Sequence, residues 1–267
     1  MSIAPQTVND PVWDMIRKTS AEHAEQEPIL ASFLHATVLN HHSLEDALSF
    51  HLANKLDSPA ASALLIREMI EEALIESTWI GEAVRADIVA TYERDSACDC
   101  VSTPLLFYKG FHALQAYRVA HWLWKNNRRP LALFLQNHIS TAFSVDIHPA
   151  ATLGKGIMLD HGTGIVIGET AVVEDNVSIM QSVTLGGTGK ESGDRHPKIR
   201  QGVLVGAGSK ILGNIEIGEG VHVSAGSVVL KDVPPHKVIA GVPAKIIGDA
   251  VGKQPALDMN QDLRCKR

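Results

Sequence analysis

The chain has 267 residues, enough for one large domain or two modest ones. Hydrophobic residues make up 45% of it and charged residues 20%, which is the composition of an ordinary globular protein. The formal net charge of −6 argues against a general nucleic-acid-binding protein and against a protein that lies on a membrane surface.

The N-terminus is polar and mixed in charge, so it does not resemble a signal peptide, and no run of roughly 18 apolar residues predicts a transmembrane helix. The cysteines number three, which suits a reducing compartment better than a disulfide scaffold. Cys98 and Cys100 have no second Cys or His pair nearby, so we interpret them as plain thiols. We therefore expect a cytoplasmic protein without a metal.

Aromatic residues and glycines divide the chain near residue 143. Every Phe, Trp and Tyr lies at or before Phe143, and of 21 glycines only Gly81 and Gly110 precede that point. Residues 1–143 are predicted to form an all-helical domain for oligomerisation. Segments 27–40 and 43–56 place apolar residues three and four positions apart, and residues 105–125 are predicted to form one long, aromatic-rich helix. Ser43 is the predicted N-cap of residues 43–56.

Residues 144–248 repeat an aliphatic residue every six positions. The series runs through Ile147, Leu153, Leu159, Ile165, Ala171, Val177 and Val183, and resumes at Ile199, Val205, Ile211, Ile217, Val223 and Val229. This period predicts a left-handed parallel β-helix of about five coils, each of about 18 residues. The predicted fold is thus α+β multidomain, with an all-α N-terminal domain followed by the β-helix. Residues 249–267 are expected to form a flexible tail.

Polar residues interrupt the repeat at places where a β-helix does not require them. The loop LGGTGKESGDRHPK (185–198) breaks the series, Asp160 and His161 interrupt it in LDHGTG (159–164), and Asp146 stands at the entrance. The separation of Asp146 and His161 along the sequence is close to one coil. Because neighbouring coils stack about 4.8 Å apart, we hypothesise that Asp146 orients His161 as a general base. The alternative is a structural aspartate and a surface histidine.

Three stretches resemble serine O-acetyltransferase, which acetylates serine in the cysteine biosynthesis of bacteria and plants. They are DIHPAATLGKGIMLDHGTGIVIGET (146–170), SVTLGGTGKESGDRHPKIRQGVLVGAGSKILGNI (182–215) and AGVPAKIIG (240–248). Residues 102–124 resemble the helical domain of the same family, so the resemblance covers nearly the whole chain. Many acyltransferases share the hexapeptide repeat, whereas LDHGTG together with GGTGKxxGDRHPKI is highly specific.

The resemblance implies direct attack of the L-serine hydroxyl on acetyl-CoA, giving O-acetyl-L-serine and CoA, with His161 as general base and Asp146 as its partner. The resemblance implies that Arg195 and His196 bind the carboxylate of serine. It also implies that Asp160 and Asp95 bind the ammonium group of serine. A helix-end role also fits Asp95. Small or basic residues are expected to bind acetyl-CoA along a groove between subunits: Gly187, Ala207, Gly208, Ala225 and Lys245. A solvated role also fits Lys245.

The resemblance further implies a homotrimer with active sites between subunits, paired through the helical domains into a hexamer. It implies inhibition by L-cysteine, which presents a thiol where serine presents its hydroxyl. Many family members bind O-acetylserine sulfhydrylase through a C-terminal isoleucine. This sequence ends in Leu-Arg-Cys-Lys-Arg, so we do not expect that complex.

Three other interpretations are open. Another hexapeptide acyltransferase, with a different acceptor, would share the β-helix. A γ-type carbonic anhydrase would use His148, His161 and His196 on zinc, although their spacing is wrong for that family. A non-catalytic β-helix scaffold would have no reason to combine these polar residues.

Overall fold

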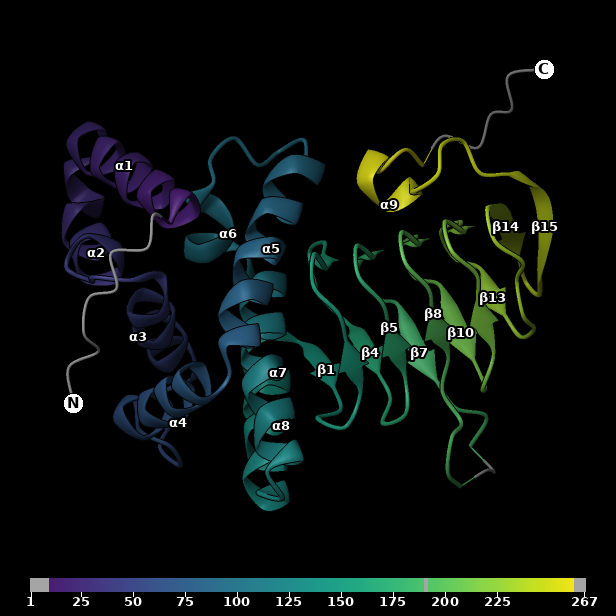
Figure 1. Cartoon of the computed structure of the whole chain (residues 1–267), viewed down its shortest axis with the longest axis horizontal. Coiled ribbons are helices and arrows are strands. Elements are labelled where there is room, and N and C mark those ends of the chain that lie inside the picture. The colour runs from purple at the N-terminus through teal and green to yellow at the C-terminus, as the bar shows by residue number, and fades with distance from the viewer. Residues whose placement is uncertain (1–9, 190–191, 262–267) are drawn as a thin grey trace.

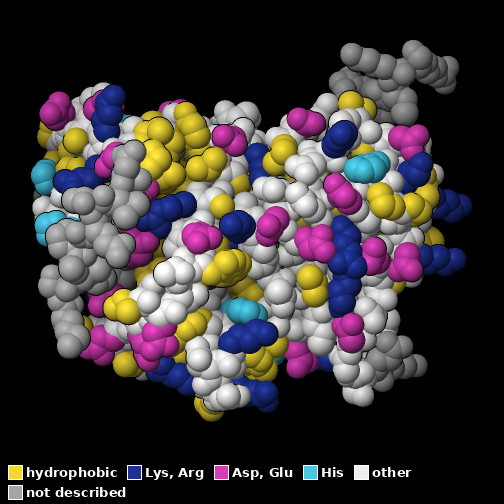
Figure 2. Space-filling view, in the orientation of Figure 1, with side chains coloured by type: hydrophobic (Ala, Val, Ile, Leu, Met, Phe, Trp, Pro, Cys, Tyr) yellow, Lys and Arg dark blue, Asp and Glu magenta, His cyan; other side chains and the backbone are white. Residues whose placement is uncertain are grey.

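The computed structural model describes residues 10–189 and 192–261. Helices form the N-terminal part and short strands form the C-terminal part, and the two parts lie side by side in Figure 1. Figure 2 shows acidic and basic side chains interspersed over both parts on the face that it presents. Within the described ranges, no helix is long and apolar enough to cross a membrane.

Helices occupy the chain as far as Phe143. They are α1 (Pro11–Gln26), the 3-10 helix η1 (Pro28–Leu30), α2 (Ala31–Leu34), the π-helix η2 (His35–Leu39), α3 (Leu44–Leu56), α4 (Ala63–Glu76), α5 (Thr78–Arg94), α6 (Ser102–Phe107), α7 (Lys109–Lys125) and α8 (Arg129–Phe143). Ser43 is the N-cap of α3, as predicted, and accepts a hydrogen bond from the Asp46 amide. The single helix expected over 105–125 is instead α6 and α7, because Tyr108 between them has an extended backbone.

The strands wind into a parallel β-helix with three faces. The first sheet contains β1 (Val145–Ile147), β4 (Ile165–Ile167), β7 (Thr184–Gly186), β10 (Lys210–Leu212) and β13 (Val228–Val229). The second contains β2 (Thr152–Leu153), β5 (Val172–Val173), β8 (Lys198–Ile199) and β11 (Glu216–Ile217). The third contains β3 (Met158–Leu159), β6 (Ser178–Ile179), β9 (Leu204–Val205), β12 (His222–Val223), β14 (Lys237–Gly241) and β15 (Ala244–Asp249). The β-helix predicted from the six-residue period is confirmed.

Aliphatic side chains stack inside the β-helix. Ile147, Ile167 and Leu185 follow one another in register on the first sheet, and each is at most 2% exposed. The step from Ile167 to Leu185 equals three repeats of the six-residue period, as expected, whereas the step from Ile147 to Ile167 is longer. The first coil is longer because its last corner, residues 160–164, is enlarged. That corner contains the Asp-His pair found in the sequence.

A buried ion pair joins the helices to the first coil. Arg118 of α7 and Asp87 of α5 are 2.7 Å apart, and both side chains are 0% exposed. Asp87 also accepts a hydrogen bond of 2.9 Å from the Ile157 amide, and Arg118 donates one of 2.8 Å to the Gly154 carbonyl. The pair therefore fixes α5 and α7 against the backbone of the β-helix, at the corner between β2 and β3.

The C-terminal segment packs back on the β-helix. β14 and β15 form an antiparallel pair, and α9 (Pro255–Asp258) follows them. The expectation of a flexible tail over 249–267 does not hold for α9. Ala256 is fully buried, its amide donates to the Gly202 carbonyl, and its carbonyl accepts from the Ser178 hydroxyl. Residues 262–267, which include Cys265, lie outside the described ranges.

Candidate active site

The predicted site residues lie at two different edges of the β-helix. The edge between the third and first sheets, here called the His161 edge, includes residues 160–164, 180–183, 206–209 and 224–227. The edge between the first and second sheets, here called the Arg195 edge, includes residues 148–151, 168–171, 187–189, 192–197 and 213–215. The first sheet separates the two edges within one chain.

His161 lies at the enlarged corner with its backbone in the left-handed region. Its φ of 57° is uncommon for a residue other than glycine. The side chain is 69% exposed, and its Nε2 lies 3.6 Å from Asp160 Oδ1. The corner therefore presents an accessible imidazole next to a carboxylate, which suits a proton acceptor for a substrate hydroxyl.

Asp160 and Asp95 form a pair of neighbouring carboxylates. Burial raises the pKa of the Asp160 carboxyl, the nearby His161 opposes this rise, and the charge of Asp95 adds to it. Asp95 follows directly after α5, and its Oδ1 accepts a hydrogen bond of 2.9 Å from the Ala97 amide. The structure thus brings Asp95, Asp160 and His161 together, and an ammonium group is the natural partner for the two carboxylates.

The register predicted for Asp146 and His161 is wrong. Because the first coil is longer than the six-residue period predicts, Asp146 pairs with Val166 of β4 and not with the corner. Asp146 Oδ1 accepts a hydrogen bond of 2.7 Å from Gln136 Nε2, and no hydrogen bond between described residues joins it to His161. The Gly164 amide nevertheless donates to the Ser144 carbonyl at 2.7 Å. This bond brings the corner beside the start of β1, which bears Asp146.

Glu169 and Thr170 hold the loop at the Arg195 edge. Arg195 Nη2 lies 2.7 Å from Glu169 Oε2, and this hydrogen bond is the main reason that the pKa of Glu169 is lowered. The Thr170 hydroxyl accepts from the backbone amides of Arg195 and His196 at 3.0 and 3.1 Å. Neither residue was predicted from the sequence. The only available signal was the Gly-Glu-Thr run that ends the first family-like stretch.

His196 packs against Gly168 at this edge and is 7% exposed. Its Nδ1 accepts a hydrogen bond of 3.2 Å from the Thr170 amide, so the neutral ring has its proton on Nε2. Burial lowers the pKa of His196, and the Arg195 cation lowers it further. A Cβ atom on Gly168 would overlap the imidazole, so glycine is required beneath it. His196 is therefore a neutral hydrogen-bond donor next to a guanidinium.

The residues predicted to bind acetyl-CoA do not all lie together. Ala207, Gly208 and Ala225 lie on the His161 edge, where the Gly226 amide donates to the Ala207 carbonyl at 2.7 Å. Gly208 has a φ of 72° and open space on its Cβ side, so a ligand can approach its backbone. The other two predicted residues lie elsewhere: Gly187 packs against Arg195 at the opposite edge, and Lys245 is exposed on β15.

Cys98 and Cys100 are free thiols, and the Cys98 thiol donates to the Cys100 carbonyl at 3.4 Å. Within residues 10–189 and 192–261, no group of three His, Cys, Asp or Glu side chains is placed to hold a metal ion. The histidines of the zinc alternative are divided between the edges: His161 lies on one, and His148 and His196 lie on the other.

Comparison with known proteins decides the family. The family pattern "Serine acetyltransferase, N-terminal" matches residues 12–116, and "Bacterial transferase hexapeptide (six repeats)" matches residues 196–231. A serine acetyltransferase from Salmonella typhimurium is 60% identical over 250 residues, which are 94% of this chain and 92% of that protein. The chain belongs to the serine acetyltransferase family. The family predicted from the motifs is thus confirmed.

Solved serine acetyltransferase structures share the fold. One in complex with cysteine has a TM-score of 0.93 and 57% identity, and the match covers 94% of this chain and 98% of that one. One from Brucella abortus in complex with coenzyme A has a TM-score of 0.89 and 53% identity, covering 91% and 97%. The soybean enzyme complexed with serine has a TM-score of 0.88 and 54% identity, covering 90% and 100%.

Proposed function

We propose that this chain transfers the acetyl group of acetyl-CoA to the hydroxyl of L-serine, giving O-acetyl-L-serine and CoA. The observation that supports this most directly is the corner where an exposed His161 stands beside Asp160 and Asp95. A proton acceptor next to two carboxylates suits a substrate with both a hydroxyl and an ammonium group. Solved relatives are complexed with serine, with coenzyme A and with cysteine.

His161 is the general base in this proposal. It removes the proton from the serine hydroxyl while the oxygen attacks the thioester carbonyl. When the tetrahedral intermediate collapses, the carbon–sulfur bond breaks and His161 returns the proton to the CoA sulfur. No covalent acyl-enzyme forms. We propose that Asp146 stabilises the imidazolium once the His161 side chain turns from Asp160 toward β1.

The serine-binding residues assigned here come from both edges. Asp95 and Asp160 pair with the ammonium group, and Arg195 and His196 bind the carboxylate. Because these two groups lie at different edges of one β-helix, we infer that the His161 edge of one subunit faces the Arg195 edge of its neighbour in a homotrimer. Three such interfaces close into a ring.

We place acetyl-CoA along the His161 edge. Ala207, Gly208 and Ala225 leave room for the pantetheine chain there, and the exposed Lys245 pairs with a phosphate. Gly187 contributes from the Arg195 edge of the neighbouring subunit. L-cysteine inhibits by occupying the serine site, because it has the same carboxylate and ammonium groups.

A hexamer built from two trimers and a cytoplasmic location remain predictions. The expectation that O-acetylserine sulfhydrylase does not bind rests on the last residues of the sequence, which lie outside the described ranges.

The direct test is thiol release from acetyl-CoA with and without L-serine, in the wild type and in His161→Ala. We expect serine-dependent release in the wild type and a loss of roughly 10²–10⁴-fold in kcat for the variant. His236→Ala is the matched control, because His236 is an exposed histidine with the same φ of 57° on a distant coil. Serine-independent thiol release would indicate hydrolysis of acetyl-CoA. Absence of release with L-serine present would contradict the proposed function and favour a different acceptor or a scaffold.

Mixing two inactive variants tests the shared site. His161→Ala and Arg195→Ala are denatured together in equal amounts and refolded. If each site forms between two subunits, the mixture should recover about a quarter of wild-type activity. In random assembly, about a quarter of the interfaces join an intact His161 edge to an intact Arg195 edge. If both residues served one site within a single chain, the mixture would remain inactive.

A further inference from the structure

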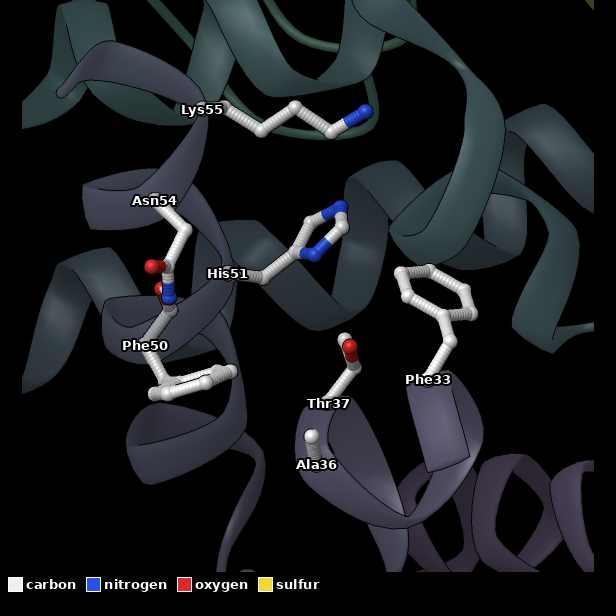
Figure 3. Close-up of a pocket in the computed structure, with 7 residues that line it drawn as sticks. All are labelled: Phe33, Ala36, Thr37, Phe50, His51, Asn54 and Lys55. Atoms are coloured by element: carbon white, nitrogen blue, oxygen red, sulfur yellow. Dashed lines mark hydrogen bonds between the residues drawn. The ribbon is translucent and has the colours of Figure 1, made fainter. Parts of the chain in front are cut away.

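A pocket with a volume of about 310 Å³ lies in the helical part, apart from both edges of the β-helix. Phe33 of α2 and residues of η2 form one side, and α3 forms the other (Figure 3). The residues lining it are Phe33, Ala36, Thr37, Phe50, His51, Asn54 and Lys55. Its volume is at the lower end of the range for small-molecule sites, so it suits a molecule with a single ring.

One ring nitrogen of the buried His51 has no partner in the described part of this fold. It is 3% exposed, and its Nε2 has no hydrogen-bond partner among the described residues. Burial, the neighbouring His112 and Lys55 lower its pKa to about 3, against the effect of the Leu106 backbone, so the ring is neutral at physiological pH. Figure 3 shows the imidazole extending from α3 into the space between Lys55 and Phe33. Such unpaired buried groups are uncommon in native proteins.

Lys55 adds an unpaired cation to the same side of the pocket. Its side chain is exposed, and no ion pair joins it to any carboxylate in residues 10–189 or 192–261. Its charge acts on His51 and on His112 behind it, so a positive potential extends into the pocket. An anionic group bound here would complement that potential.

Two aromatic rings form the apolar walls, and other groups hold each of them in place. Phe33 stacks on Phe107 with centroids 6.3 Å apart and meets the edge of His51 at 6.1 Å. The guanidinium of Arg67 lies 5.9 Å from the centroid of the Phe50 ring. Because both walls are already ordered, a planar apolar body can enter with little loss of side-chain freedom.

We propose that this pocket binds a small aromatic monocarboxylate, with its ring between Phe33 and Phe50 and its carboxylate beside Lys55 and His51. The assignment is independent of the function proposed above, because none of these residues belongs to the acetyl-transfer site. It combines three properties of one cavity: aromatic walls, an unpaired ammonium group and a buried imidazole nitrogen without a partner.

The test is calorimetric titration of the full chain with benzoate, in the presence of saturating coenzyme A and L-cysteine to block the acetyl-transfer site. We expect benzoate to bind at one site per chain and benzamide, which lacks the charge, to bind more weakly. Lys55→Met should weaken benzoate binding about tenfold, because the charge-assisted contact is lost. Lys18→Met is the matched control, an exposed lysine of α1 outside the pocket, and should leave binding unchanged.

His51→Phe provides an independent variant that preserves the packing of a ring while removing its nitrogens. It too should weaken benzoate binding, and its urea unfolding curve should match that of the wild type if folding is intact. The proposal is wrong if the wild type does not bind benzoate. A second copy of the chain that covers the pocket would give this result. It is equally wrong if Lys55→Met and Lys18→Met bind benzoate alike.

Discussion

Gly110, in the first turn of α7, lies directly against the backbone carbonyl of Leu159, the residue that precedes the Asp160–His161 corner. A Cβ atom at position 110 would overlap that carbonyl, and Gly162 of the same corner lies against the Gly110 backbone. The helical part therefore contacts the candidate catalytic corner from behind. The position of α7 therefore sets the position of His161.

Gly110→Ala should reduce serine acetylation while favouring the helix locally. Alanine is the better helix former by about 1 kcal/mol, yet its methyl group must push α7 away from Leu159. A displacement of this kind beside a general base should lower kcat/KM roughly tenfold to hundredfold. Steady-state kinetics would measure this effect. Gly81→Ala is the control, because its methyl group meets mainly the flexible ends of Glu45 and Arg85. Equal activity in both variants would contradict the coupling.

Removing one partner of the buried Asp87–Arg118 pair should strongly destabilise the protein. Arg118→Met leaves the buried Asp87 carboxylate without its cation and should cost about 3–5 kcal/mol in the free energy of unfolding. The double variant Asp87→Asn, Arg118→Met should lose less than the two single variants added together. Arg67→Met breaks a surface pair with Glu71 and should cost less than about 1 kcal/mol. Urea denaturation measures both losses. Equal free energies of unfolding for Arg118→Met and Arg67→Met would contradict this prediction.

Gly168→Ala should impair serine binding by displacing His196. The added methyl group would occupy the position of the His196 ring, so the neutral donor assigned to the serine carboxylate moves. We expect the KM for serine to rise roughly tenfold, as for a lost charge-assisted hydrogen bond, with little change in the KM for acetyl-CoA. Gly248→Ala has open space around its new methyl group and serves as the control. A rise confined to the KM for acetyl-CoA would show that His196 contacts the other substrate.

Much of the fold could be predicted from periodicity. An aliphatic residue at every sixth position fits only a narrow coil, so the β-helix followed from steric requirements alone. The local register of the coils could not be predicted in this way. The corner 160–164 lengthens the first coil, and no period reveals an insertion that keeps the aliphatic pattern. The six-residue period puts the separation of Asp146 and His161 at nearly one coil, whereas the longer first coil pairs Asp146 with Val166 of β4.

The composition of the site was also easier to predict than its arrangement. His161, Asp160, Arg195 and His196 are unusual enough within a β-helix to be found by residue type. Their division between two edges depends on which corner each occupies, and this follows only from the three-dimensional pairing of coils. Thr170 escaped notice because a threonine at a corner is ordinary, and only the structure shows its hydroxyl accepting from two loop amides.

The pH dependence of serine binding should follow Asp160. An ammonium group requires the ionised carboxylate, and burial together with Asp95 raises the pKa of Asp160. As the pH falls through this raised pKa, Asp160 takes up a proton and the KM for serine should rise. The rise should begin at a higher pH than for an ordinary aspartate, whose pKa is about 3.9. The KM for acetyl-CoA should not follow the same curve.

Asp95→Asn distinguishes the contributions of Asp95 and Asp160 to the pH dependence of the KM for serine. Removing the like charge makes ionisation of Asp160 easier, so its pKa falls and the rise in the KM for serine moves to lower pH. The KM should also be higher at every pH, because one partner of the ammonium group is lost. Asp99→Asn, which removes an exposed carboxylate from the same segment, should leave the profile in place. If Asp95→Asn instead moved the rise to higher pH, the two carboxylates would not share one ammonium site.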